Sequence, residues 1–207
     1  VFFTVSSHGY EMKKDGFGFA GLKITPQAGQ VSEIKLDRVN IAERLCRLTG
    51  EGLYRDSILL GYEPPIANPL IRARIAGQDS IQTAIYNNKV YWFWGDTLRM
   101  EYPLGLFRMA GSTTPIPDVN DFASDPAAGI DYQYFVDEKS GFARPMMPLK
   151  ERPEGVIWIN SLCVVPDKHG IERLLGYYSR RKGLEEAYEH GIAIFDDEAA
   201  EFVVAKQ

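Results

Sequence analysis

Apolar and polar residues alternate in short runs along most of this chain, a pattern that favours β-strands over helices. The clearest example is the pair of segments 81–86 (IQTAIY) and 90–96 (VYWFWGD), which flank the turn sequence NNK. Asn tolerates the positive φ that tight hairpin turns demand, so the pattern predicts an antiparallel hairpin. Both faces of the second segment are apolar, which is typical of a strand buried on two sides.

The same order of elements occurs a second time further along the chain. In both halves an apolar strand, a turn, an aromatic-ended strand, a loop and another strand follow one another. This weak internal repeat of roughly 75 residues indicates a fold built from similar units. It predicts two β units, at 77–150 and 151–207. The other predicted strands are 104–113, 131–136, 155–165, 172–181, 188–197 and a last one that begins at 201.

The N-terminal region, 1–61, has a different pattern. Short apolar runs at 1–7, 16–25 and 31–36 alternate with turn residues, which predicts a small antiparallel β unit. Within it, the sequence GFGFAG at 16–21 formally matches the glycine pattern of dinucleotide-binding loops. That interpretation needs a strand before the glycines and a helix after them. Neither is expected here, so we interpret these glycines as turn residues.

A connecting region follows this unit. Ile41, Leu45 and Leu48 recur at helical spacing, so one short helix or a tight connecting segment is expected. Residues 62–69 hold three prolines, which predicts an extended segment with little helix. We therefore place a linker and domain boundary at 62–76.

Three stretches carry a resemblance to a known family: QDSIQTAIYNNKVYWFWGDT at 78–97, WINSLCVVPDKHGIERLLGYYS at 158–179 and EHGIAIFDDEAAEF at 189–202. They resemble the five-bladed β-propeller glycoside hydrolases of the arabinanase- and xylosidase-like group, and their uncharacterised bacterial relatives. The resemblance implies an all-β fold. A partial β-propeller of about two blades, 77–150 and 151–207, would follow a small β-sandwich-like segment.

The resemblance also implies roles for individual residues. Asp79 matches the family's general base or nucleophile, at the inner end of a strand that faces a central pocket. The family's second-blade acid falls on Asn160 or Ser161, so that carboxylate is missing. The general acid is a Glu of the third blade and would lie beyond residue 207, so we expect the chain to be a fragment. The expected substrate-binding residues are Asp96, Trp94, Trp158 and Asn160.

Each of these roles has a structural alternative. Glycoside hydrolysis needs two carboxyl groups that flank the scissile bond, and Asp79 is the candidate for the ionised one. Asp79 would otherwise cap a strand end by accepting backbone N–H bonds. Asp96 would be a turn acid that binds local amides together with Thr97. Trp92 and Trp94 either stack on a sugar or pack in the core, and the apolar residues on both faces favour core packing.

The charge balance and hydropathy exclude two classes of partner. The chain has 23 Lys and Arg against 28 Asp and Glu, a net charge of −5, and it has no basic block. A nucleic-acid partner is therefore not expected. No apolar stretch approaches the roughly 18 residues that a transmembrane helix needs, so no membrane insertion is expected.

Neither metal nor cofactor is expected from the candidate ligands. The acidic loop 118–126 clusters oxygen atoms, but it lacks the glycine and the closing Glu of a calcium-binding EF-hand loop. The three histidines have no second ligand at metal spacing: they are His8, His169 and His190. Cys46 and Cys163 either form a disulfide or are two thiols, and the sequence leaves both possibilities open.

Together these patterns lead to one functional expectation and one alternative. The chain is expected to be a carbohydrate-active protein, a glycoside hydrolase-like propeller that acts on or binds a glycan in its axial pocket. The alternative is a non-catalytic carbohydrate-binding or cell-surface interaction protein. A secreted or periplasmic location is expected, with an N-terminal segment ahead of Val1 that is missing here. The sugar and the oligomeric state stay open.

Overall fold

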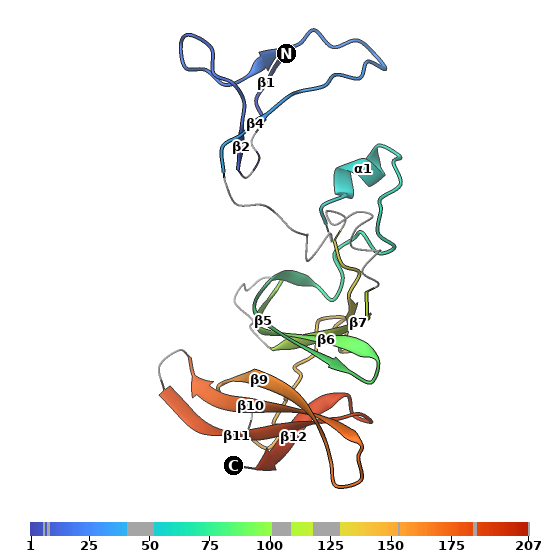
Figure 1. Ribbon diagram of the computed structural model, residues 1–207, viewed down its shortest axis with the longest axis vertical. Helices are drawn as coiled ribbons and strands as arrows, with labels where there is room; N and C mark the ends of the chain where they lie inside the picture. Colours follow the sequence, from blue (N-terminus) through green and yellow to red (C-terminus); the bar gives the residue numbers. More distant parts are fainter. Residues whose placement is uncertain are drawn as a thin grey trace. The chain divides into compact units, whose positions relative to one another are not determined.

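The chain folds into two compact units, Val1–Leu45 and Cys46–Gln207. The computed structural model describes residues 1–5, 7, 9–40, 52–100, 109–117, 129–152, 154–183 and 186–206. Within these ranges nearly all regular structure is β-strand (Figure 1), so the all-β prediction is confirmed.

The first unit contains two small antiparallel sheets. β1 (Phe2–Phe3) pairs with β3 (Leu22–Lys23), and β2 (Tyr10–Glu11) pairs with β4 (Asp37–Arg38). These strands are much shorter than the apolar runs suggest. In the described part of this unit, Met12 is the only large hydrophobic side chain that is buried. The alternating apolar faces have no second layer to pack against here, and strand pairing without such a layer stays short.

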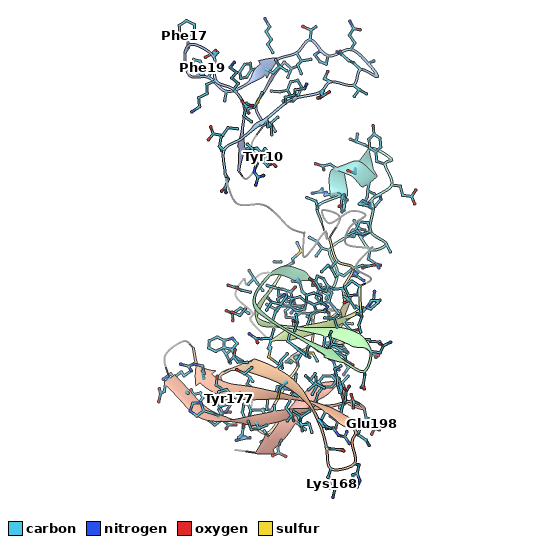
Figure 2. All side chains as sticks on the ribbon, viewed as in Figure 1. Tyr10, Phe17, Phe19, Lys168, Tyr177 and Glu198 are labelled. Atoms are coloured by element: carbon cyan, nitrogen blue, oxygen red, sulfur yellow. The ribbon has the colours of Figure 1, made fainter. Side chains whose placement is uncertain are left out.

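The glycine-rich stretch of this unit is a tight turn, as predicted. The carboxylate Oδ1 of Asp15 accepts hydrogen bonds from the backbone amides of Phe17 and Phe19, both at 2.9 Å. Gly18 has a φ of +85°, which glycine adopts without steric cost. The loop therefore holds both phenylalanine rings outward (Figure 2), and 89% of Phe17 and 68% of Phe19 is exposed.

The second unit begins with a connecting region and one short helix, α1 (Arg55–Leu59). This helix lies in the region where a short helix or a tight connection was predicted. The residues with helical spacing, 41–48, lie outside the described part of the chain. Among the residues that the structure describes, no helix is long and apolar enough to cross a lipid bilayer.

Two four-stranded antiparallel sheets make up the rest of the second unit (Figure 1). In each sheet the strands follow one another in chain order, which is the order of strands in a propeller blade. The first sheet consists of β5 (Ile75–Tyr86), β6 (Lys89–Arg99), β7 (Ala110–Pro115) and β8 (Gln133–Tyr134). The second sheet consists of β9 (Val156–Pro166), β10 (Glu172–Lys182), β11 (Glu186–Asp196) and β12 (Glu201–Lys206).

The two sheets lie next to each other like neighbouring blades of a propeller. Of the strands in different sheets, the two first strands, β5 and β9, come closest along their length. Most strand boundaries agree with the predicted ones to within a few residues, except that β5 and β6 extend further at the ends away from their shared turn. The first part of the predicted strand 104–113 lies outside the described residues, and β7 begins at Ala110. The prediction of an all-β fold with about two propeller-like blades is therefore confirmed.

An aromatic core joins the two sheets. Tyr91 and Phe93 of β6 meet Phe195 of β11 and Phe202 of β12, with ring centroids 5.4 Å apart for Tyr91–Phe195 and 5.1 Å for Phe93–Phe202. Met146 is fully buried in the same cluster, and its carbonyl accepts a hydrogen bond of 2.6 Å from the Phe202 amide. One apolar face of the strand 90–96 is thus buried between the sheets, as the sequence predicted.

Candidate functional site

The hairpin of β5 and β6 brings two aspartates together. Asn87 and Asn88 have φ values of +47° and +57°, the left-handed conformation that a two-residue hairpin turn requires. Asp79 lies eight residues before this turn and Asp96 eight residues after it. The strand register pairs them directly. We call Asp79 and Asp96 the carboxylate pair.

Among the described residues, each aspartate of the carboxylate pair accepts one hydrogen bond. Asp79 is exposed, and its Oδ1 accepts the backbone amide of Ser80 at 2.6 Å. Asp96 is half-buried, and its Oδ1 accepts the indole Nε1–H of Trp158 at 3.1 Å. Within the described ranges no Lys or Arg forms a salt bridge with either side chain. Like charges directly opposite in a sheet are destabilising, so the carboxylate pair lowers the stability of this hairpin. Proteins retain such local destabilisation at functional sites.

Neither aspartate lies at the end of its strand. β5 begins at Ile75, so Asp79 lies inside the strand and does not cap its end; its Oδ1 accepts the amide of the adjacent Ser80, and its other oxygen has no partner in the described part of the chain. Asp96 is not a turn acid, because β6 continues to Arg99 and places Asp96 inside the strand. Its hydrogen bond comes from the second sheet rather than from local amides.

A kink in β5 follows Asp79. Ser80 has a φ of +57°, and it lies opposite Gly95 in the register. This conformation costs a non-glycine residue about 1–3 kcal/mol, and such strain is found at functional sites. Ser161 in β9 has the same conformation, with a φ of +52°. The kink is therefore a feature of the first strand in both sheets.

A cavity of about 420 Å³ opens beside Asp79. It combines aromatic and aliphatic walls with a carboxylate, an amide and a hydroxyl group. Its described walls come from β5, the preceding segment, Trp94 and the β8 region, so within the described residues it belongs to the first sheet and not to a hollow shared by both sheets. The residues around it are Ile71, Ile75, Ala76, Gly77, Gln78, Asp79, Ser80, Ile81, Trp94, Tyr132 and Tyr134.

The curl of the first sheet creates this cavity. The hydroxyl of Tyr134, in β8, donates a hydrogen bond of 3.0 Å to Oε1 of Gln78, in β5. In a flat sheet these two strands would lie three strand spacings of about 4.8 Å apart. A direct hydrogen bond between their side chains therefore requires the sheet to curl. Arg72 also pairs with Asp131 at 2.7 Å and fixes the segment before β5 to the start of the β8 region.

Trp94 is a wall of the cavity and at the same time a packed residue. Only 6% of it is exposed, and the rings of Tyr132 and Tyr134 lie 5.2 Å and 5.8 Å from it. Trp92 is half-buried and donates its indole N–H to Oγ1 of Thr114 at 2.9 Å. Packing is thus the main role of both tryptophans, and Trp94 has only a small surface left for a ligand.

The other two predicted binding residues lie in the second sheet. Trp158, in β9, reaches the carboxylate pair through its hydrogen bond to Asp96. Asn160 is exposed and pairs with Tyr177 of β10, which Figure 2 labels on the second sheet. Asn160 is not among the residues that surround the cavity. Of the predicted site residues, Asp79 and Trp94 are among the residues around the cavity, whereas Asp96, Trp158 and Asn160 are not. Asp96 is joined to Asp79 by the strand register and to Trp158 by its hydrogen bond.

Of the described cavity residues, the sequence predicted only Asp79 and Trp94 as site residues. Gln78, Tyr132 and Tyr134, which shape the cavity through the contact between β5 and β8, were not predicted. Gln78 directly precedes Asp79, and the segment 131–136 was predicted only as a strand. Its alternating aromatic residues were a usable signal, because they could have marked one face of an outer strand. Nothing in the local pattern shows that this strand curls back towards β5.

A separate ionic cluster lies in the second sheet around Glu189. Its Oε1 accepts the hydroxyl of Tyr178 at 2.9 Å, and its Oε2 forms salt bridges with Arg152 and with Arg180, the latter at 3.1 Å. Burial opposes ionisation of this carboxyl group. The hydrogen bonds from Tyr178 and Arg180 and the charges of both arginines outweigh it and hold the pKa of Glu189 below its ordinary value.

The residues that the sequence offered as candidate metal ligands do not form a metal site in the described part of the chain. Among the described residues, no group of three or more His, Cys, Asp or Glu side chains is arranged to hold a metal ion. His169 is a turn residue, as predicted, and its amide bonds to Asp167 at 2.8 Å. Cys163 is a free, exposed thiol. The acidic loop 118–126, His8 and Cys46 lie outside the described ranges.

No family model, no curated protein and no solved structure matches this chain. The site offers carboxylate, amide and hydroxyl oxygens beside aromatic and aliphatic surface, and none of the described cavity walls is a cationic side chain. Such an arrangement suits a neutral ligand that is rich in hydroxyl donors.

Proposed function

We propose that the second unit binds a carbohydrate in the cavity beside Asp79, with Asp79 accepting hydrogen bonds from sugar hydroxyl groups. One observation carries this proposal: the exposed carboxylate of Asp79 borders a cavity that is walled by Trp94, Tyr132 and Tyr134. A sugar presents apolar C–H faces, which suit aromatic walls, and hydroxyl donors, which suit a carboxylate. The resemblance to arabinanase- and xylosidase-like propellers supports the same ligand class.

The size of the cavity agrees with a small glycan segment. Its volume of about 420 Å³ lies within the range of about 300–1,000 Å³ that is usual for small-molecule pockets. The anionic carboxylate pair and the lack of cationic walls disfavour sugars that carry a carboxylate or phosphate group. Neutral pentose oligosaccharides are therefore the first probes to use.

Calorimetric titration with xylotriose and arabinotriose tests the proposal. The Asp79→Asn substitution keeps the shape of the side chain and removes its charge. A hydrogen bond to a charged group contributes about 1.5–3 kcal/mol, so we expect affinity to fall about tenfold or more. The control is Glu138→Gln, which removes an equal charge from an exposed residue outside the cavity. Equal affinities for wild type and Asp79→Asn would contradict the proposal.

A second candidate function is hydrolysis of the bound glycan, and the carboxylate pair favours it. Directly opposed residues have Cβ atoms about 4.5–5.5 Å apart. Two carboxyl groups that start from such positions can reach the separations of about 5–9.5 Å seen in glycoside hydrolases. In this function Asp79, the exposed member, would be the general base or nucleophile, as the family resemblance implies.

Turnover separates the hydrolytic function from the non-catalytic alternative. Release of reducing sugar from xylotriose or arabinotriose is measured at saturating substrate, where differences in affinity no longer matter. Loss of a general base lowers the rate about 10²–10⁴-fold, so Asp79→Asn should abolish measurable turnover while Glu138→Gln retains it. Binding by the wild type with no product formed would favour a carbohydrate-binding protein.

A further inference from the structure

Trp158 is the point where the second sheet meets the carboxylate pair. It belongs to β9, whereas Asp79 and Asp96 belong to β5 and β6. Its indole Nε1–H donates to Asp96 Oδ1 at 3.1 Å, although 62 residues separate the two side chains in the chain. Hydrogen bonds to a charged acceptor are roughly twice as strong as neutral ones, so this contact can fix the rotamer of Asp96.

The indole of Trp158 can approach the first sheet closely because residue 95 is a glycine. A Cβ atom at Gly95 would lie 3.3 Å from Cδ1 of Trp158 and 3.0 Å from Cβ of Ser80. A Cβ atom at residue 95 would therefore require these neighbours to shift by a few tenths of an ångström. The indole therefore occupies space that is free because residue 95 has no side chain, next to the strained Ser80 and the carboxylate it contacts.

A third residue supports the indole from its own sheet. The guanidinium carbon of Arg181, in β10, lies 5.9 Å from the centroid of the Trp158 ring. A cation at this distance over an aromatic face is attracted to the ring. Trp158 is thus held by Arg181 in the second sheet and by Asp96 in the first.

We propose that Trp158 is a positioning residue that holds Asp96 opposite Asp79, so that the ligand site of the first sheet is complete only when the second sheet is docked. This proposal rests on the proposed carbohydrate site. Two carboxylates at directly opposed positions repel each other, and an unrestrained Asp96 would turn away. Asp96 does not line the cavity itself. With Oδ1 held by the indole, its other oxygen would accept a hydroxyl group from the part of the sugar that extends past Asp79.

The matched pair Trp158→Phe and Trp92→Phe tests this role. Each substitution removes one indole hydrogen bond from a half-buried tryptophan and keeps an aromatic ring. Neither tryptophan is among the residues around the cavity, and the ring of Trp92 packs against the cavity wall Tyr132. Because the indole of Trp92 bonds to Thr114 and not to the carboxylate pair, Trp92→Phe reports the effect of losing an indole hydrogen bond near the cavity. We expect Trp158→Phe to weaken binding of xylotriose or arabinotriose about tenfold, and Trp92→Phe to leave it within about twofold. Equal effects of the two variants on affinity would overturn the proposal.

A measurement without ligand separates failure of this proposal from failure of the proposed function. Hydrogen exchange of the Trp158 indole N–H is followed by NMR in the wild type and in Asp96→Ala. If Asp96 holds the indole, exchange should become about tenfold faster in the variant, while the Trp92 indole is unchanged. Unchanged exchange at Trp158 would overturn the positioning role even if sugars bind. Accelerated exchange together with no sugar binding would support the contact and reject the carbohydrate function.

Discussion

The ionic cluster around Glu189 allows a stability prediction with an internal control. The side chain of Glu189 is 13% exposed and that of Arg180 is 9% exposed, and they form a salt bridge of 3.1 Å. Arg180 also contacts Glu154 at 3.3 Å, but that side chain is 63% exposed. The same arginine therefore has one buried and one exposed acidic partner. Neutralising each partner separately compares a buried with an exposed ion pair at a single site.

Glu189→Gln should lower the free energy of unfolding several times more than Glu154→Gln does. Removing one partner of a buried ion pair leaves the other charge uncompensated and costs about 3–5 kcal/mol. We expect Glu189→Gln to cost about 3 kcal/mol, the low end of that range, because Gln can still accept the Tyr178 hydroxyl. Loss of an exposed pair costs about 0–1 kcal/mol, so Glu154→Gln should have little effect.

Urea unfolding at neutral pH measures both costs. With a slope of about 2 kcal/mol per molar urea, the midpoint should fall by about 1.5 M in Glu189→Gln and by less than about 0.5 M in Glu154→Gln. Equal midpoints for the two variants would refute the assignment of Glu189 as the buried anchor of the cluster.

The pH dependence of the same variants gives a second check. Because the folded-state pKa of Glu189 is lowered, its ionised form stabilises the fold above the unfolded pKa of about 4.3. This stabilisation is lost as the pH falls through the lower, folded-state pKa. The difference in stability between wild type and Glu189→Gln should therefore shrink in acid. A difference that stays constant from neutral pH into this acidic range would contradict the linkage.

Two further predictions concern the contact between the sheets. Burial of Tyr86 and its hydrogen bond of 2.8 Å to Asp197 raise the pKa of its phenol to about 12. Stability should consequently fall as the pH rises from about 10 to about 12, by at most about 1.4 kcal/mol per unit, and Tyr86→Phe should lose this dependence in alkaline urea titrations. A Cβ at Gly111 would lie 2.9 Å from Met146, which is fully buried, so Gly111→Ala should cost about 1–3 kcal/mol by thermal unfolding. Gly77→Ala is its control, since nothing lies within 4 Å of a Cβ there, and equal losses would contradict the packing argument.

Much of the first hairpin could be predicted from the sequence because its determinants are local. Two asparagines set the turn, and strand alternation sets which residues share a face. Once the turn is placed, the pairing of Asp79 with Asp96 follows by counting along the two strands. The family resemblance pointed instead to Asn160 or Ser161 as the position of a second acid, because it compares corresponding blades and says nothing of the pairing within one hairpin.

The sequence by itself determined the all-β fold, the order and approximate bounds of most strands in the two large sheets, and the hairpin turn between β5 and β6. These features depend on neighbouring residues, through turn conformation and period-two alternation. Only the tertiary structure decided that the first sheet curls until Tyr134 reaches Gln78, 56 residues away, and that Trp158 reaches Asp96. Both contacts arise from the packing of whole sheets, where shape and buried area act between distant segments, and no local pattern encodes them.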